Sequence, residues 1–143
     1  AFPGGGNAAY RKSVFDKVGL FNPELGRKGN SLIGAEEKDL FDKMVDNGIK
    51  FYYLPDAILY HIILPATLTN DYFQRLTYSI GKSERIRTLA ISKKKYYSRL
   101  FSEAVKWAAT IVLWSKFFFT ANVQKGNKLL LFRYNVTKGL LGR

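Results

Sequence analysis

The chain has 143 residues, of which 47% are hydrophobic and 15% aromatic, and this is enough apolar material for one modest core. It is too short for two independently folding domains, and the lack of cysteine excludes a disulfide framework or a thiolate metal site. It begins Ala1-Phe2-Pro3, without an initiator methionine or a basic-then-apolar leader, so we expect a fragment without a signal peptide.

The net charge of +12 is unevenly distributed along the chain. Residues 1–81 carry nine Lys or Arg and nine Asp or Glu, whereas residues 82–143 carry fourteen basic and two acidic side chains. A neutral, acid-bearing part followed by a basic, aromatic part suggests a chemical module joined to an attachment module. We therefore expect a catalytic segment over residues 1–91 and a helical segment for membrane association over residues 92–143.

The chain opens with a glycine-rich run that includes Gly5 and Gly6, and glycine permits a close approach that no residue with a side chain allows. Taken alone, this run is also typical of a flexible chain end. Residues 7–10, beginning with Asn7, read as a short strand that could bring an amide to a pocket.

A short helix is predicted over residues 11–18, ended by Gly19, with three apolar side chains inward: Val14, Phe15 and Val18. A turn over residues 20–25 follows. Residues 26–31 then form a basic, glycine-bearing loop, and loops of this kind often cover a site.

The segment from about Ala35 to Asn47 is predicted to be an amphipathic helix. At about 100° per residue its apolar stripe contains Leu40, Phe41, Met44 and Val45. Glu37 falls in the middle of that stripe. The opposite, solvated side contains Asp39, Asp42, Lys43 and Asp46.

Two interpretations of the acids at this helix start remain open. Glu36 and Glu37 complement the helix dipole as ordinary first-turn acids, which typically contributes 0.3–1 kcal/mol. A solvated helix start does not need its acid on the buried side, however, so Glu37 is also a candidate general base that the helix amino terminus keeps ionised.

Two aromatic and β-branched runs, residues 51–54 and 57–61, are predicted to be strands separated by a turn at Pro55-Asp56. The second run ends at His61, the only histidine, which is either a structural side chain or a metal ligand. Thr69 is predicted to cap a long helix. Arg75 and Lys82 on that helix could meet an anion, although surface cations are usually only solvated.

Four motifs in order resemble the carboxyl-terminal half of inverting family-two glycosyltransferases of the GT-A fold. The resemblance extends from about Gly4 to about Arg87. The motifs are the runs 6–11 (GNAAYR), 14–21 (VFDKVGLF) and 34–40 (GAEEKDL), then 53–57 (YLPDA) with Tyr60-His61.

This resemblance implies an α/β fold, the acceptor-side half of a nucleotide-diphospho-sugar transferase, followed by amphipathic helices. It implies that Glu37 deprotonates an acceptor hydroxyl, which attacks the anomeric carbon of a nucleotide sugar with inversion. The family usually has Glu-Asp where this chain has Glu36-Glu37, so which acid acts stays open. The resemblance also implies a sugar or lipid-linked acceptor and a role in surface polysaccharide or glycolipid synthesis.

Substrate contacts are expected along the same segment, from Gly5, Gly6, Asn7 and Gly34, with Arg75 and Lys82 as candidates for the diphosphate. A divalent metal, Mg²⁺ or Mn²⁺, is expected for the complete enzyme, and His61 could approach it. Its main carboxylate ligands, in the family's Asp-x-Asp motif, have no counterpart here. We therefore expect the chain to be inactive alone.

Residues 96–122 are predicted to be helical, with one stripe formed by Leu100, Trp107, Ile111, Trp114 and Phe118. Residues 104–121 would span about 27 Å, close to a bilayer core. Lys106 and Lys116 interrupt this run, so we prefer a helix lying in the membrane interface, tryptophans down and lysines up. The preferred location is cytoplasmic, peripheral at the inner face of the cell membrane.

A turn at Gly126-Asn127 and a further helix are expected next, with an apolar stripe of Leu129, Phe132, Val136 and Leu140. Three alternatives to a membrane-associated enzyme remain. The helices could simply pack on each other or on a missing half. A nucleic-acid-binding module is disfavoured because the aromatic residues form a dense block and no recognition motif is present, so no nucleic acid is expected as a partner. The third alternative is a non-catalytic, membrane-associated scaffold that holds a partner.

Overall fold

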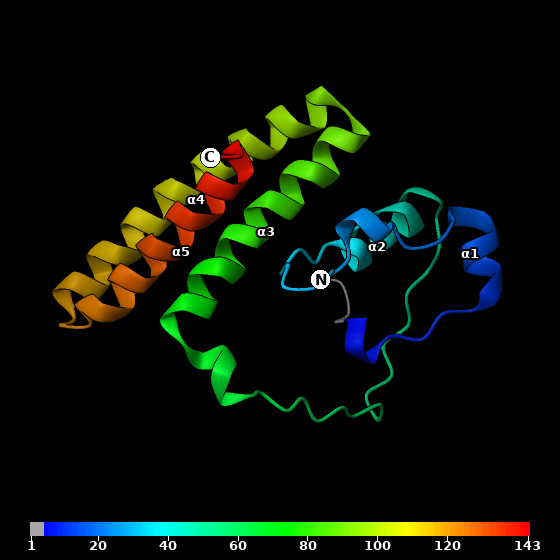
Figure 1. Ribbon diagram of the computed structural model, residues 1–143, viewed down its shortest axis with the longest axis horizontal. Helices are drawn as coiled ribbons and strands as arrows, with labels where there is room; N and C mark the ends of the chain where they lie inside the picture. Colours follow the sequence, from blue (N-terminus) through cyan, green and yellow to red (C-terminus); the bar gives the residue numbers. More distant parts are fainter. Residues whose placement is uncertain (1–4) are drawn as a thin grey trace.

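The computed structural model describes residues 5–143 of the chain, and the elements of this part are all helical (Figure 1). In chain order they are η1 (Gly5–Asn7), α1 (Lys12–Val18), η2 (Pro23–Leu25), α2 (Glu36–Asp46), η3 (Pro65–Leu68), α3 (Asn70–Ile91), α4 (Lys93–Phe119) and α5 (Val123–Leu141). The predicted α/β fold class is therefore wrong, because no sheet forms within residues 5–143.

The expected strands at residues 7–10, 51–54 and 57–61 are irregular or turn-like instead. The turn at Pro55-Asp56 is confirmed, and the Ala57 N–H donates to the Leu54 carbonyl oxygen at 3.2 Å. Both flanking runs are exposed along their whole length. A strand requires a neighbour to complete its ladder of hydrogen bonds, and β-propensity alone does not provide one.

Helices α1 and α2 begin and end close to the predicted residues. Gly19 follows α1 with φ = 80°, and Gly48 follows α2 with φ = 68°, so both ends use the positive φ that glycine tolerates. The first core of the molecule lies between these two helices. Its fully buried part is Leu40, Phe41 and Met44 of α2, and the partly buried residues packed on it are Ala8, Tyr10, Val14, Phe15, Val18 and Ile49.

The solvated side of α2 differs from the prediction. Val45, expected in the core, is half exposed, because the core wraps around the side that carries Leu40 and Met44. Asp39, expected in water, is buried and pairs with Lys43 at 2.7 Å between carboxylate and ammonium. In an i, i+4 ion pair of this kind, a lysine one turn further along the helix covers the carboxylate and balances its charge.

Helices α3, α4 and α5 are the longest of the molecule and lie side by side (Figure 1). The predicted cap of α3 is confirmed, since the Thr69 hydroxyl accepts from the Tyr72 N–H at 3.2 Å. Ser92 similarly caps α4, accepting from the Lys95 N–H at 3.0 Å, and makes the sharp corner between the two helices.

Two glycines allow the backbones of α3 and α5 to touch. A Cβ at Gly81 would clash with the Val136 carbonyl oxygen and lie 2.8 Å from the Leu140 nitrogen. A Cβ at Gly139 would clash with the Tyr78 carbonyl oxygen in the same way. Such contacts require residues without side chains on both helices.

The connection between α4 and α5 lies earlier than predicted. Gly126 and Asn127 are inside α5, and the turn falls at residues 120–122, where Ala121 adopts φ = 55°. Gly126 is needed there for packing, because a Cβ would lie 2.9 Å from Trp114 Cδ1.

Among residues 5–143, no helix combines the length and the apolar character that a membrane span requires. The division into residues 1–91 and 92–143 stays a prediction.

Candidate functional site

The acid pair opens α2, as predicted. Glu36 and Glu37 are the first two residues of the helix, and both are half-buried. Ala35, which precedes them, is buried, and its N–H donates to the Leu25 carbonyl oxygen at 2.9 Å. Because the unsatisfied N–H groups of a helix start carry a partial positive charge, this position stabilises carboxylates.

Glu37 lies near Tyr10. Tyr10 follows the glycine-rich start of the chain and packs against the buried side of α2. Burial raises the pKa of the Tyr10 hydroxyl, and the negative charge of Glu37 raises it further. The Tyr10 hydroxyl oxygen is enclosed and makes no hydrogen bond within residues 5–143. Its ring stacks on Phe41, with the two centroids 6.1 Å apart.

Glu36 lies beside Gly34. One carboxylate oxygen of Glu36, Oε2, is enclosed and has no hydrogen-bond partner in the described part of the chain. A Cβ at Gly34 would be 3.9 Å from this oxygen and 3.9 Å from Arg27 Nε. The Gly34 N–H donates to the hydroxyl oxygen of Ser83 on α3 at 3.3 Å, which fixes the loop that precedes the acids. The structure thus brings together two predicted site residues, Gly34 and Glu36.

The glycine-rich opening lies against the exposed run that was predicted to be a strand. Gly5 to Asn7 form a short 3₁₀ turn, and Gly4 lies outside the described residues. The Asn7 side-chain amide donates to the Ala57 carbonyl oxygen at 2.8 Å, and a Cβ at Gly6 would be 3.8 Å from Leu59 Cδ2. The amide of Asn7 is therefore held by the backbone of the chain itself.

The remaining predicted residues lie apart from the acid pair. Arg75 of α3 donates to the Asn30 carbonyl oxygen at 3.1 Å and lies 3.6 Å from Asp71, so it ties the basic loop to α3. Lys82 is exposed on α3, and His61 is exposed in the irregular segment. No group of three or more His, Asp or Glu side chains within residues 5–143 could hold a metal ion.

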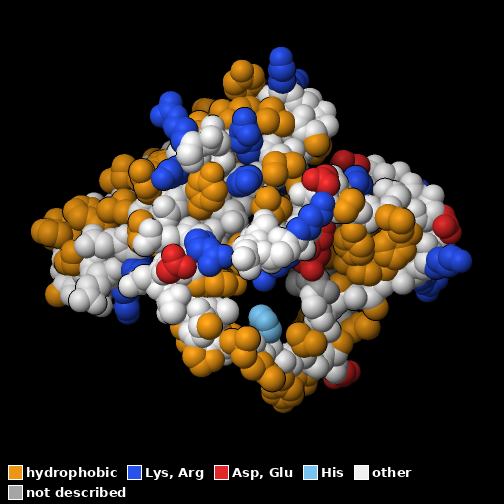
Figure 2. All heavy atoms as spheres, viewed as in Figure 1, with side chains coloured by type: hydrophobic (Ala, Val, Ile, Leu, Met, Phe, Trp, Pro, Cys, Tyr) orange, Lys and Arg blue, Asp and Glu red, His pale blue; other side chains and the backbone are white. Residues whose placement is uncertain are grey.

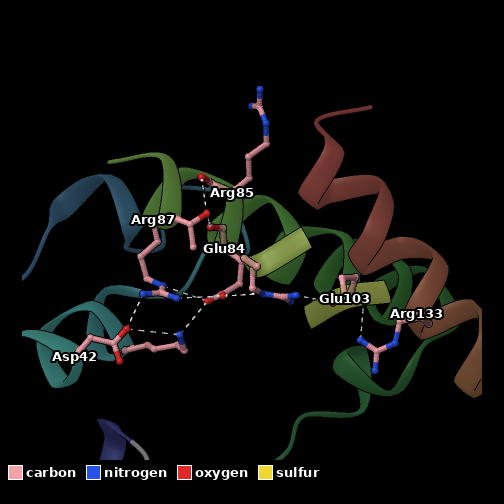
Figure 3. A network of polar contacts seen from close by, with 9 residues as sticks. Asp42, Glu84, Arg85, Arg87, Glu103 and Arg133 are labelled. Atoms are coloured by element: carbon pink, nitrogen blue, oxygen red, sulfur yellow. Dashed lines mark hydrogen bonds and ion pairs between the residues drawn. The ribbon is translucent and has the colours of Figure 1, made fainter. Parts of the chain in front are cut away.

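A chain of buried ion pairs, which the sequence analysis missed, joins α2 to the long helices (Figure 3). Arg87 of α3 is 3% exposed and donates to Asp42 of α2 at 2.6 Å. It also donates to Glu84 of its own helix at 3.2 Å. Lys38, in the first turns of α2, lies 3.4 Å from Glu84 as well.

The same chain continues across α4 and α5. Arg99 donates to Glu84 at 3.0 Å and to Glu103 at 2.7 Å. Arg133 of α5 donates to the other oxygen of Glu103 at 2.8 Å. Carboxylates and guanidinium groups therefore alternate from α2 through α3 and α4 to α5, and each buried charge has an opposite partner, which is the condition for burying charge at tolerable cost.

The ion pairs lower the pKa of both Glu84 and Glu103. Burial alone would raise the pKa of Glu84, but the hydrogen bond from Arg87 and the charges of Arg87, Lys38 and Arg99 outweigh it. Together they lower the pKa of Glu84 from 4.5 to about 2. Burial likewise opposes the ionisation of Glu103, and the hydrogen bonds from Arg133 and Arg99 lower its pKa nevertheless.

One signal for this network was present in the sequence. Residues 82–143 contain only two acids, and each has an arginine three or four positions away, Arg87 for Glu84 and Arg99 for Glu103. This spacing places the charges on one helix face, where they pair. No spacing in the sequence indicated that Arg87 also pairs with Asp42 of α2.

Hollows of appreciable size lie away from the acid pair. One, of about 390 Å³, is lined by Asn70, Gln74, Gln124, Asn127, Lys128 and Leu131 between α3 and α5. Neither Glu36 nor Glu37 lines this hollow. Comparison with known proteins gave no relative: no family model, no curated protein and no solved structure matches the chain.

Proposed function

We propose that this chain supplies the acceptor-activating carboxylates of an inverting glycosyltransferase. Glu37 takes the proton from an acceptor hydroxyl, and the oxygen forms a bond to the anomeric carbon of a nucleotide sugar. The bond from that carbon to the diphosphate breaks on the opposite side, and the nucleoside diphosphate leaves with the electron pair. The order of four motifs, with the acid pair among them, supports this reaction class.

One structural observation carries the proposal. Two enclosed oxygens, Glu36 Oε2 and the Tyr10 hydroxyl, make no hydrogen bond within residues 5–143; the first belongs to the acid pair and the second lies near Glu37. Leaving a buried polar atom without a partner typically costs 1–3 kcal/mol, so native proteins keep few of them. Two such oxygens, one in the acid pair and one on the neighbouring Tyr10, support a hydroxyl-bearing acceptor as the missing hydrogen-bond partner.

The roles of the two acids follow from their surroundings. Glu37 lies in the first turn of α2, beside Tyr10, where the helix amino terminus carries a partial positive charge, and we assign it the role of the base. Glu36, next to Gly34, supplies the second carboxylate, whose enclosed Oε2 has no hydrogen-bond partner within residues 5–143.

The test is sugar transfer by the product of the complete reading frame, measured as nucleoside diphosphate release over a panel of nucleotide sugars and acceptors. Glu37→Gln keeps the size of the side chain and removes the base. A general base typically contributes 10²–10⁴-fold, so we expect kcat to fall by about 10²-fold or more. The control is Glu24→Gln, which removes an exposed carboxylate that pairs only with Lys28 on the surface.

Two results would overturn the assignment. Transfer by Glu37→Gln at the rate of the unchanged protein would remove Glu37 from the chemistry. A loss of transfer in Glu36→Gln together with full activity in Glu37→Gln would move the base to Glu36. Equal losses in Glu24→Gln would indicate damage unrelated to catalysis.

A further inference from the structure

The outward face of α4 is an apolar stripe that the fold does not use. Its members are Tyr97, Phe101, Val105, Val112 and Phe119, which recur every four or seven residues and so lie on one side of the helix. Phe101 is 74% exposed and Phe119 is 85% exposed. Within residues 5–143 nothing covers this stripe, which we call the α4 outer face.

This face is not the one that the sequence pattern indicated. The predicted membrane-facing tryptophans point at α5: Trp107 Nε1 donates to the Thr137 hydroxyl oxygen at 2.9 Å. Trp114 Nε1 donates to the Asn127 side-chain oxygen at 3.1 Å. The expectation that the tryptophans face a membrane is therefore wrong, because these side chains hold the α4–α5 pair together.

The charge around the α4 outer face has one sign. The two carboxylates of residues 82–143, Glu84 and Glu103, are both buried in ion pairs. Exposed charges in this part of the chain are cations, and on α4 they are Lys93, Lys94, Lys95, Lys106 and Lys116. Hydrophobic side chains and blue Lys and Arg side chains accordingly mix over the upper left of the molecule in Figure 2, where α4 and α5 lie.

The lysines are placed to flank the stripe. Lys94 lies three residues before Tyr97 and Lys116 three residues before Phe119, so both emerge near the apolar side. The flexible stems of lysine can run along apolar surface while the ammonium reaches upward to phosphate groups. An apolar face bordered by cations, without an exposed carboxylate nearby, matches an amphipathic helix that lies in a membrane interface.

We propose that the α4 outer face binds the surface of an anionic phospholipid bilayer, with α4 parallel to the membrane plane. Phe101, Val112 and their neighbours enter the boundary between headgroups and acyl chains, and the lysines contact lipid phosphates. The area of the stripe provides an apolar contribution, and the cations provide attraction that depends on anionic lipid. This proposal does not depend on the one above for Glu37.

The experiment is co-sedimentation of the chain with phosphatidylcholine vesicles, with and without phosphatidylserine. We expect binding to the anionic vesicles only, and weaker binding at high salt because exposed charges are screened. Phe101→Gln/Val112→Gln should weaken binding at least tenfold. The matched control, Ile58→Gln/Leu68→Gln, changes two side chains of similar exposure elsewhere and should bind as the unchanged chain does.

Separate variants test the contribution of the lysines to binding and the depth to which the apolar side chains enter the bilayer. Lys94→Glu/Lys116→Glu should weaken binding about fivefold for each cation lost, which corresponds to about 1 kcal/mol per basic residue at an anionic surface. Lys12→Glu/Lys50→Glu is the control, since both lysines are exposed outside α4. The emission of a tryptophan introduced by Phe101→Trp should shift to the blue on binding, whereas emission from Trp107 and Trp114 should change little.

Three outcomes would overturn the proposal. The chain does not sediment with anionic vesicles, or Phe101→Gln/Val112→Gln binds them as strongly as the unchanged chain. The third is that a single-stranded oligonucleotide binds with higher affinity than the vesicles and the stripe substitutions leave that binding intact, which would assign the cations to nucleic acid.

Discussion

Replacing Glu84 by glutamine tests whether the buried ion pairs stabilise the fold. Glu84 contacts Arg87, Arg99 and Lys38, and Gln removes the negative charge with little change in shape. The two arginines keep their other carboxylates, Asp42 and Glu103, so neither becomes an isolated buried cation. The substitution therefore reports on the charge of Glu84 itself.

The magnitude follows from the pKa of Glu84, which falls from 4.5 to about 2. Each pKa unit corresponds to 1.36 kcal/mol, so ionisation of Glu84 contributes about 3 kcal/mol to the free energy of unfolding at neutral pH. Because the pKa is lowered in the folded state, this contribution is fully present above about pH 4.5. It is lost as the pH falls towards 2.

The assay is urea unfolding followed by far-ultraviolet circular dichroism, at neutral pH and in steps down to about pH 2. We expect Glu84→Gln to lose about 3 kcal/mol at pH 7 and to show a shallower loss of stability below pH 4.5 than the unchanged chain. Glu24→Gln, at an exposed pair on the surface, should unfold like the unchanged chain. The reasoning is refuted if Glu84→Gln unfolds at the original urea midpoint, or if both proteins lose stability in acid with the same slope.

Two further substitutions test the packing and the backbone. Gly81→Ala should destabilise the chain by about 3 kcal/mol or more, because its methyl group would meet the backbone of Val136 and Leu140, whereas Gly26→Ala adds only an ordinary contact at 3.7 Å from the Pro23 carbonyl oxygen. Equal unfolding midpoints in urea for the two variants would contradict the close approach of α3 and α5. Ala121→Gly should raise the free energy of unfolding by up to about 1 kcal/mol, since Ala121 has φ = 55° and glycine relieves that strain. A lower thermal midpoint for this variant would show that the strain is absent.

The helices could be predicted because their signals are local. Spacing of apolar residues, the Thr69 cap and the glycines at residues 19 and 48 each act within a few residues, so the pattern in the sequence is sufficient. The placement of Glu36 and Glu37 at a helix start followed from the same local rules. The irregular runs at 51–54 and 57–61 were mispredicted because a strand depends on a partner that local sequence does not specify.

Long-range packing was the part that sequence reasoning could not supply. Periodicity placed Trp107 and Trp114 on one stripe correctly, but it could not show that α5 covers this stripe. For the same reason, Asp42 was assigned to solvent although Arg87 reaches it from a helix 45 positions further along. The sequence of one helix shows which of its faces is apolar or charged. Which other helix packs on that face depends on the fold of the whole chain.

The ion pair between Asp42 and Arg87 also sets the orientation of α2 relative to α3. Asp42 lies five residues after Glu37 on the same helix, about 7.5 Å along the axis, so the guanidinium of Arg87 acts as a clamp on the rotation of that helix. The orientation of the Glu37 carboxylate therefore depends on the position of the three long helices. A tilt of those helices would be transmitted to the acid pair as a turn of α2, without any change at the helix start itself.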